Sequence, residues 1–308
     1  QHIDDAAAVA AHLKIPHHTV DLVEPFRHAV KEYFAEEYRT GRTPNPCARC
    51  NSLIKFGLLL DKALEFGADH LATGHYARVE QLTDGHCRLL KGVDPRKDQS
   101  YFLFALTLHQ LSRLIFPLGG FTKDKVRQMA AEFSLPVKDK GESQEICFIP
   151  DNDYVRFLER ECGLNPNNGG VVNLCGEMLG RHAGIHRYTV GQRRGLGIAY
   201  SEPLYVLGVD AGSNEVVAGI ERELYCNGLI ASGFNWLCTP SLPLSATCKI
   251  RYRHKPVACE VRDAGEGKME VRFAEPQKSI TPGQAVVLYD GDMLLGGGWI
   301  ENGVKRDG

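Results

Sequence analysis

Residues 43–78 read TPNPCARCNSLIKFGLLLDKALEFGADHLATGHYAR, and this stretch decides the fold of the first half of the chain. Pro44 and Pro46 each lack a backbone donor and restrict the residue before them, so the first eight residues predict a loop. Asn51 then predicts the N-cap of a helix that ends at Gly67. The segment ADHLAT that follows predicts a strand ending at a polar turn. Such alternation is typical of an α/β domain whose sites lie at the carboxyl ends of parallel strands.

The flanking sequence continues this alternation. DDAAAVAAHL, at 4–13, predicts a helix, and HHTVDL, at 17–22, predicts a short strand. A further helix is expected from Thr122 to the residues before Pro136. Another helix is predicted by apolar residues that recur every fourth position up to Gly41, namely Phe26, Val30, Phe34 and Tyr38. We therefore expect an α/β domain with a parallel sheet over residues 1–146.

The pattern changes in the second half of the chain. A helix is expected at 153–161, and short strands with glycine-containing turns follow from Val171 onward. The last hundred residues show almost no helical periodicity, which favours a small antiparallel barrel. We expect a small central domain over residues 147–213 and a C-terminal antiparallel β-barrel over residues 214–308.

Composition excludes several classes of protein. The 308 residues are 43% hydrophobic and 24% charged, which excludes a mainly disordered chain. The sequence contains no run of 18 apolar residues, so it predicts no membrane span. The first residues do not resemble a secretory signal. The net charge of −2 argues against a protein that coats nucleic acid. We expect a cytoplasmic protein with no membrane partner. The chain does not begin with Met, which is consistent with a missing N-terminal piece.

Ten cysteines are more than this length usually carries, and only Cys47 and Cys50 form a close pair. With no targeting signal, the count favours a reducing compartment with mostly free thiols. Cys248 and Cys259, in strand-like runs, are expected to be small buried residues. Cys50 is expected at a helix N-terminus beside Arg49, where the dipole and the guanidinium lower a thiol pKa. Two alternatives remain for Cys47 and Cys50: the pair could form half of a structural zinc site, or the two thiols could be incidental. The sequence contains no second CxxC motif that would support a zinc site.

The other candidate thiol is Cys147, in GESQEICFIP. Apolar neighbours surround it, so on its own the segment predicts a buried strand cysteine. Spacing in the sequence does not show whether Cys147 approaches Cys50. If the two meet, they can exchange a disulfide or pass on a persulfide.

Two basic segments without acidic residues favour RNA binding. The first lies between Met178 and Ala199 and contains TVGQRRGLGI, in which glycines flank paired arginines suited to phosphates. The second, KIRYRHK at 249–255, predicts a strand with its basic side chains on one face and Tyr252 on the other. The alternative for this stripe is a solvated strand face. The arginines of the first segment are Arg181, Arg187, Arg193 and Arg194.

Eight motifs, in this order, resemble the tRNA-specific 2-thiouridylase family: TPNPCARCN, ATGHYAR, KDQSYFL, SQEICFIP, TVGQRRGLGI, RYRH, TPGQAVVLYDG and LGGGWI. The resemblance covers essentially the whole chain. It implies that residues 1–146 form an α/β nucleotide-binding domain of the PP-loop, Rossmann-like class, incomplete at its N-terminus, followed by a small central domain and a C-terminal antiparallel β-barrel. It also implies the replacement of the 2-oxygen of the tRNA wobble uridine by sulfur, with ATP and Mg²⁺ as cofactors. The implied partners are tRNA and a sulfur donor, either a sulfur-relay protein or a cysteine desulfurase.

The resemblance also implies roles for single residues. Cys50 matches the nucleophile and Cys147 the persulfide-bearing cysteine, and the two thiols end the cycle as a disulfide. Gly74 matches a nucleotide-contacting glycine. The implied tRNA-binding residues are Asn45, Pro46 and Cys47 at the target base, then His75, Lys97, Asp98, Gln99, Arg251, Tyr252 and Gln284, to which the basic segment adds Arg193 and Arg194.

The chain departs from the family pattern at two places. Family members often carry Asp where this chain has Cys47, so Cys47, Cys50 and Cys147 form a secondary hypothesis for an iron–sulfur cluster. An SGGxDS-type phosphate loop is absent from the 308 residues, so we expect an N-terminally truncated chain. This absence supports an alternative, an inactive tRNA-binding fragment. A dithiol oxidoreductase using Cys47 and Cys50 is a third hypothesis.

Overall fold

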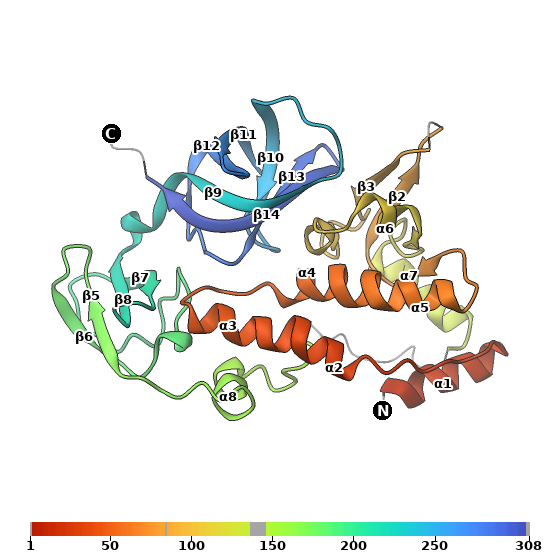
Figure 1. Cartoon of the computed structure of the whole chain (residues 1–308), viewed down its shortest axis with the longest axis horizontal. Helices are drawn as coiled ribbons and strands as arrows, with labels where there is room; N and C mark the ends of the chain where they lie inside the picture. Colours follow the sequence, from red (N-terminus) through yellow and green to blue (C-terminus); the bar gives the residue numbers. More distant parts are fainter. Residues whose placement is uncertain (1, 84, 136–145, 306–308) are drawn as a thin grey trace.

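The structure is a computed structural model that describes residues 2–83, 85–135 and 146–305. Figure 1 shows three parts: helices and a small sheet from the first half of the chain, a small β domain, and a barrel formed by the last strands. No helix among these residues is long and apolar enough to cross a membrane.

Two long helices lie side by side in the first part (Figure 1). One joins α2 (Val23–Phe26), the π-helical η1 (Arg27–Glu32) and α3 (Tyr33–Arg39), which confirms the helix predicted from the apolar stripe. The second joins α4 (Pro46–Cys50), the π-helical η2 (Asn51–Leu58) and α5 (Leu59–Glu65). The helix predicted at 4–13 is confirmed as α1 (His2–Leu13).

The N-cap of the second long helix lies six residues before the predicted one. Pro46 is the first helical residue, where a missing N–H costs nothing. Asn45 is the N-cap, and its Oδ1 accepts a hydrogen bond from Ala48 N at 3.2 Å. The predicted loop over TPNPCARC and the predicted cap at Asn51 are therefore wrong. Pro46 starts the helix instead of preventing it.

The described part of the α/β domain has a two-stranded parallel sheet of β1 (Leu71–Ala72) and β4 (Leu114–Ile115). The strand predicted at 17–22 is wrong: no described strand pairs with it, so its backbone forms no ladder. An antiparallel hairpin of β2 (Ala77–Gln81) and β3 (Cys87–Lys91) follows β1. The remaining helices are η3 (Ser100–Leu103), α6 (Leu108–Ser112) and α7 (Lys123–Glu132), and the last confirms the helix predicted from Thr122.

The small β domain follows α8 (Tyr154–Arg160), which confirms the helix predicted at 153–161. Its sheet has the order β6-β5-β8-β7. The strands are β5 (Gly169–Val172), β6 (Met178–His182), β7 (Leu204–Asp210) and β8 (Glu215–Ile220), with the 3-10 turn η4 (Ile185–Arg187) after β6. Because β8 lies beyond the expected domain boundary at residue 213 yet pairs with β7, we propose that this domain extends to Ile220.

Six antiparallel strands form a closed barrel, since β13 pairs with both β10 and β14; this confirms the predicted C-terminal barrel. The turn η5 (Glu221–Leu224) leads into it. The strands are β9 (Tyr225–Trp236), β10 (Leu244–Lys249), β11 (Val257–Gly265), β12 (Lys268–Lys278), β13 (Ala285–Asp290) and β14 (Met293–Val304). β3 also pairs with β14 at Leu90 and Met293. Cys248 and Cys259 are buried in this barrel, as predicted.

One hydrophobic core joins the barrel to the helical part. It contains Ala48 and Phe56 from the second long helix, Leu103 from η3, and Val287 and Tyr289 from β13. The barrel is therefore packed directly against the elements that carry the predicted site.

Replacing Leu103 by Ala tests this shared core. Leu103 is fully buried, so Leu103→Ala should destabilise the protein by about 2–5 kcal/mol. The loss of stability is measured by urea unfolding, monitored by tryptophan fluorescence. Trp299 reports on this core because the centroid of its ring lies 5.1 Å from that of Phe104. The exposed Leu108→Ala is the control, and equal unfolding midpoints for the two variants would contradict the shared core.

Candidate active site

The loop that begins the second long helix is fixed to the barrel. Gln284 Nε2 donates to the carbonyl oxygens of Thr43 at 3.2 Å and Pro44 at 2.8 Å. Thr43 N donates in turn to Pro282 O at 2.9 Å. Gly283, at φ +89°, lets the two backbones meet, because a Cβ there would lie 2.6 Å from Thr43 O. Gln284, a predicted tRNA contact, thus holds the predicted base-contacting loop.

The structure brings Cys147 near the Cys47–Cys50 pair, which lies far from it in the sequence. Cys47 and Cys50 lie on α4, and Cys147 lies close enough to affect the electrostatics of both. All ten cysteines of the chain are free in the structure. Cys47 and Cys147 reach solvent, and Cys50 is half-buried.

Cys147 lies on a turn in which Ile149 N donates to Ile146 O at 2.8 Å. The expectation of a buried strand cysteine is therefore wrong. The apolar neighbours that suggested it are the anchors of the turn: Phe148 packs edge-on against Phe34 at 5.4 Å and lies 5.3 Å from Phe157. Burial of Phe148 leaves the adjacent thiol exposed.

The local environment raises the pKa of both thiols on α4. Although part of the Cys47 side chain reaches solvent, the protein atoms packed around it partly desolvate the thiol and raise its pKa to about 11, with a further contribution from Cys147. Burial likewise raises the pKa of Cys50, and the Lys55 ammonium opposes the shift. The expected lowering by a helix N-terminus and Arg49 is wrong. Cys50 is the fifth helical residue, and the Arg49 guanidinium lies over the Tyr33 ring at 5.0 Å.

The iron–sulfur hypothesis gains no support from the geometry. Within residues 2–83, 85–135 and 146–305, no three His, Cys, Asp or Glu side chains are placed to hold a metal ion. This statement includes Cys47, Cys50 and Cys147, all of which are described. We do not pursue a cluster at these thiols.

Gly74 and His75 lie just past the carboxyl end of β1, where the fold class places ligands. A Cβ on Gly74 would meet only Leu118 Cδ1, at 3.6 Å, so the space beside this backbone is open. The His75 ring packs against Phe56 at 5.3 Å and Phe116 at 5.7 Å, and its Nδ1 lies 2.8 Å from Thr73 Oγ1. Burial, and secondarily Lys55, lowers the pKa of His75 to about 3, so this imidazole is neutral near pH 7.

The predicted tRNA residues Lys97, Asp98 and Gln99 have different roles in the structure. Asp98 is buried, and one of its oxygens accepts from the backbone N–H groups of Gly92 and Ser100 at 3.1 Å each. Gln99 Oε1 accepts from Tyr76 N at 2.9 Å. Asp98 therefore shapes the loop, while Lys97 is the half-buried cation that the loop carries.

The second basic segment is not a strand stripe. β10 ends at Lys249, which is buried, and the residues after it form a turn, so the predicted four-charge face is wrong. The turn packs against η3: the rings of Tyr252 and Phe102 lie 4.5 Å apart. Asn51 Nδ2 donates to Phe102 O at 3.2 Å, which joins the turn through η3 to the cysteine-bearing helix. Tyr252 is thus connected through η3 to the helix that carries Cys47 and Cys50, while Arg251 Nη1 donates to Lys278 O at 3.4 Å.

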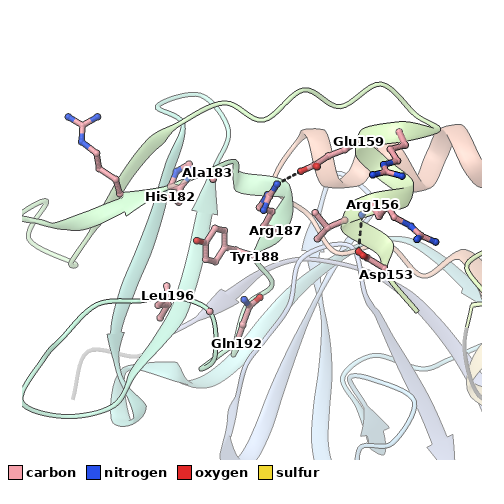
Figure 2. Close-up of a pocket in the computed structure, with 13 residues that line it drawn as sticks. Asp153, Arg156, Glu159, His182, Ala183, Arg187, Tyr188, Gln192 and Leu196 are labelled. Carbon is pink, nitrogen blue, oxygen red and sulfur yellow. Dashed lines mark hydrogen bonds and ion pairs between the residues drawn. The ribbon is translucent and has the colours of Figure 1, made fainter. Parts of the chain in front are cut away.

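Arg193 and Arg194 lie in an exposed loop of the β domain, before β7. Gln192, at the start of that loop, borders a cavity of about 750 Å³ between α8 and the sheet (Figure 2). Across the cavity Glu159 accepts from Arg187 Nη2 at 2.6 Å. Four arginines line it, namely Arg156, Arg160, Arg181 and Arg187.

Sequence reasoning missed Lys55, whose ammonium influences Cys47, Cys50 and His75. Its five-residue distance from Cys50 gives no signal in an α-helical pattern, where the two side chains point about 140° apart. The π-helical η2 changes that relation.

Replacing His75 by Gln should change the acid stability of the protein. The unfolded chain binds a proton below pH 6.5 and the folded state only near pH 3, so the wild type loses stability as pH falls through this window. The loss by pH 5 is about 2 kcal/mol. Urea midpoints between pH 7 and pH 5 should fall less for His75→Gln than for the wild type, and identical slopes would contradict a buried neutral imidazole.

Three family models match consecutive parts of the chain. They are described as tRNA methyl transferase HUP domain, over residues 1–151, tRNA methyl transferase PRC-barrel domain, over 156–219, and aminomethyltransferase beta-barrel domain, over 226–300. The three matches agree with the order of the parts in Figure 1 and confirm the predicted fold class.

Curated relatives match nearly the whole chain. The tRNA-specific 2-thiouridylase MnmA of Geotalea uraniireducens is 58% identical over 304 residues, which are 98% of this chain and 81% of the relative. The protein of the same name from Carboxydothermus hydrogenoformans is 49% identical over 97% of this chain and 83% of its own length. These matches give no support to an inactive fragment or a dithiol oxidoreductase. The resemblance seen in the motifs is confirmed: the chain belongs to the tRNA-specific 2-thiouridylase family.

Proposed function

We propose that this protein is a tRNA-uridine 2-sulfurtransferase that replaces the 2-oxygen of the wobble uridine by sulfur, with ATP as activator and a Cys147 persulfide as sulfur source. The observation that carries the proposal is that Cys147, from a separate segment, lies near enough to Cys50 to influence its thiol electrostatically, beside a loop fixed to the barrel. The names of the relatives support the same substrate and reaction.

Sulfur transfer follows from the two thiols. The terminal sulfur of the Cys147 persulfide attacks C2 of the activated uridine, and the adenylated 2-oxygen leaves as AMP. The Cys50 thiolate then attacks Sγ of Cys147, and the electron pair of the broken S–S bond stays on the sulfur bound to C2. The products are 2-thiouridine and a Cys50–Cys147 disulfide, which a dithiol reductant returns to two thiols.

ATP supplies the leaving group in this scheme. Gly74 fits one wall of a nucleotide site, because its open backbone lies at the carboxyl end of a parallel strand. We propose that Mg²⁺ accompanies the ATP phosphates, and we derive no step through the ion.

Cys47 differs from Cys50 in its suitability as a nucleophile. With a pKa of about 11 it stays protonated at neutral pH. It can therefore donate a weak S–H hydrogen bond to the target base, but it is unsuited to act as a base. We propose that Asn45, Pro46 and Cys47 form the wall against which the base lies.

The tRNA surface is proposed to run from this wall over the barrel turn to the β domain. Its residues are Asn45, Pro46, Cys47, His75, Lys97, Gln99, Arg251, Tyr252 and Gln284, together with Arg193 and Arg194, and the buried Asp98 shapes the loop that presents Lys97 and Gln99. Among the described residues, Arg160 and Arg181 in the cavity of Figure 2 pair with no acid, so the cavity can also accept phosphates.

The sulfur donor is proposed to be a sulfur-relay protein or a cysteine desulfurase that reaches the exposed Cys147. We place the reaction in the cytoplasm, because the proposed substrate is tRNA and both relatives described above are bacterial proteins.

Loading of Cys147 tests the proposal. After incubation with a cysteine desulfurase and cysteine, peptide mass spectrometry should find one added sulfur on Cys147. Cys147→Ser and Cys50→Ser should each lower ATP-dependent formation of 2-thiouridine at least about 100-fold, because each removes a reacting atom. Labelling confined to other cysteines would contradict the assigned source.

The matched control for both cysteine variants is Cys175→Ser. Cys175 is exposed and free like Cys147, but it lies in the β domain. It should keep the wild-type yield of thiolated tRNA. Equal losses in the Cys147 and Cys175 variants would show a general thiol requirement instead of a specific one.

Replacing Arg251 by Ala should weaken tRNA binding roughly tenfold, since one charge-assisted contact to phosphate is lost. The slope of log affinity against log salt should fall by about 1. The control is Arg262→Ala on β11, an exposed arginine that pairs with Glu260. Filter binding at several salt concentrations measures both, and an unchanged slope for Arg251→Ala would remove it from the interface.

A further inference from the structure

Lys55 has an unusual position relative to Cys50. It lies in η2, whose N-cap is Cys50, and the π-helical spacing is seen where Leu59 N donates to Ile54 O. In a π-helix the residue five positions on closes the turn, so Lys55 lies one wide turn after Cys50 on the same side. The second long helix therefore presents a thiol and an ammonium to one place.

Among the described residues, no acid compensates the charge of Lys55. The side chain is half-buried, and it forms no ion pair with any acid among residues 2–83, 85–135 and 146–305. The titratable groups that face it are the Cys47 and Cys50 thiols and the His75 imidazole, which is neutral. Cys147 completes the group from the turn packed against it.

Arg49, the cation next to Cys50 in sequence, does not take this role. Its guanidinium lies 5.0 Å from the Tyr33 ring centroid, and its Nε is buried without a partner. Burial raises the pKa of Cys50, and Lys55 is the cation that opposes this effect. A half-buried thiol that must attack as a thiolate needs such a cation.

We propose that Lys55 is a positioning residue for sulfur transfer, whose ammonium stabilises the anionic, nucleophilic form of the Cys50 sulfur against the effect of burial. The inference rests on the proposed function in that Cys50 is taken as the attacking thiol. It extends that function by naming the group that increases the share of Cys50 present as the attacking thiolate.

The test measures Cys50 directly and needs no tRNA. The full chain is alkylated with iodoacetamide between pH 7 and pH 11.5, a range that includes a thiol pKa raised by burial, and the Cys50 peptide is quantified by mass spectrometry. Lys55→Met should move the midpoint of alkylation upward by about one pH unit, which is roughly a tenfold loss of thiolate near pH 7. Lys55→Arg should keep the wild-type midpoint, because it keeps the charge.

The control is Lys62→Met on α5, an exposed lysine paired with Glu65, which should leave the midpoint unchanged. Lys55→Gln is a second neutral variant. It replaces Lys55→Met in the experiment if circular dichroism shows that Lys55→Met does not fold. A wild-type midpoint in a folded Met or Gln variant overturns the inference, even if thiolation is lost. A shifted midpoint in a protein whose Cys147 takes no sulfur supports Lys55 and defeats only the proposed sulfur source.

Discussion

The two hydrogen bonds from the Gln284 amide to the carbonyl oxygens of Thr43 and Pro44 are the constraint on which the site depends. They fix the residues before Asn45, and Asn45 caps the helix that carries Cys47, Cys50 and Lys55. A shift of this loop would move every one of those groups together. Gln284, which holds this loop, lies 240 residues after Pro44 in the sequence. The barrel is therefore part of the active site's support as well as a proposed tRNA surface.

The shared hydrophobic core that makes this arrangement rigid also works against its chemistry. Ala48, Phe56 and Tyr101 pack close to the start of the helix and exclude water. Burial of this kind raises a thiol pKa and lowers an imidazole pKa, as seen at Cys47 and His75. A rigid site thus needs a fixed cation to keep one sulfur reactive. The π-helical turn supplies it from the same helix, so the cation and the thiol move as one unit.

Caps and periodicity predicted most of the fold, and the errors have physical causes. Thr122 and Asp153 were correct helix starts because each side chain accepts from a backbone N–H three residues on. Pro46 was misjudged because its missing donor matters inside a helix and is harmless at the first position. The strand at 17–22 was inferred from composition, but a strand exists only beside a partner. In the candidate site, the residue types were readable from the sequence, whereas the approach of Cys147 to Cys50 depends on tertiary packing by Phe148.

The two proposed reacting thiols differ in exposure, and this difference orders the transfer. Cys147 reaches solvent on a turn whose flanking Phe148 is packed inward, so a donor protein can approach its sulfur without disturbing the helices. Cys50 is half-buried on a capped helix, so it meets only a sulfur that is already inside the site. We infer that sulfur enters at the exposed thiol and that the buried thiol acts second. Exchanging the roles would require a macromolecular donor to reach a thiol that the packed helix partly covers.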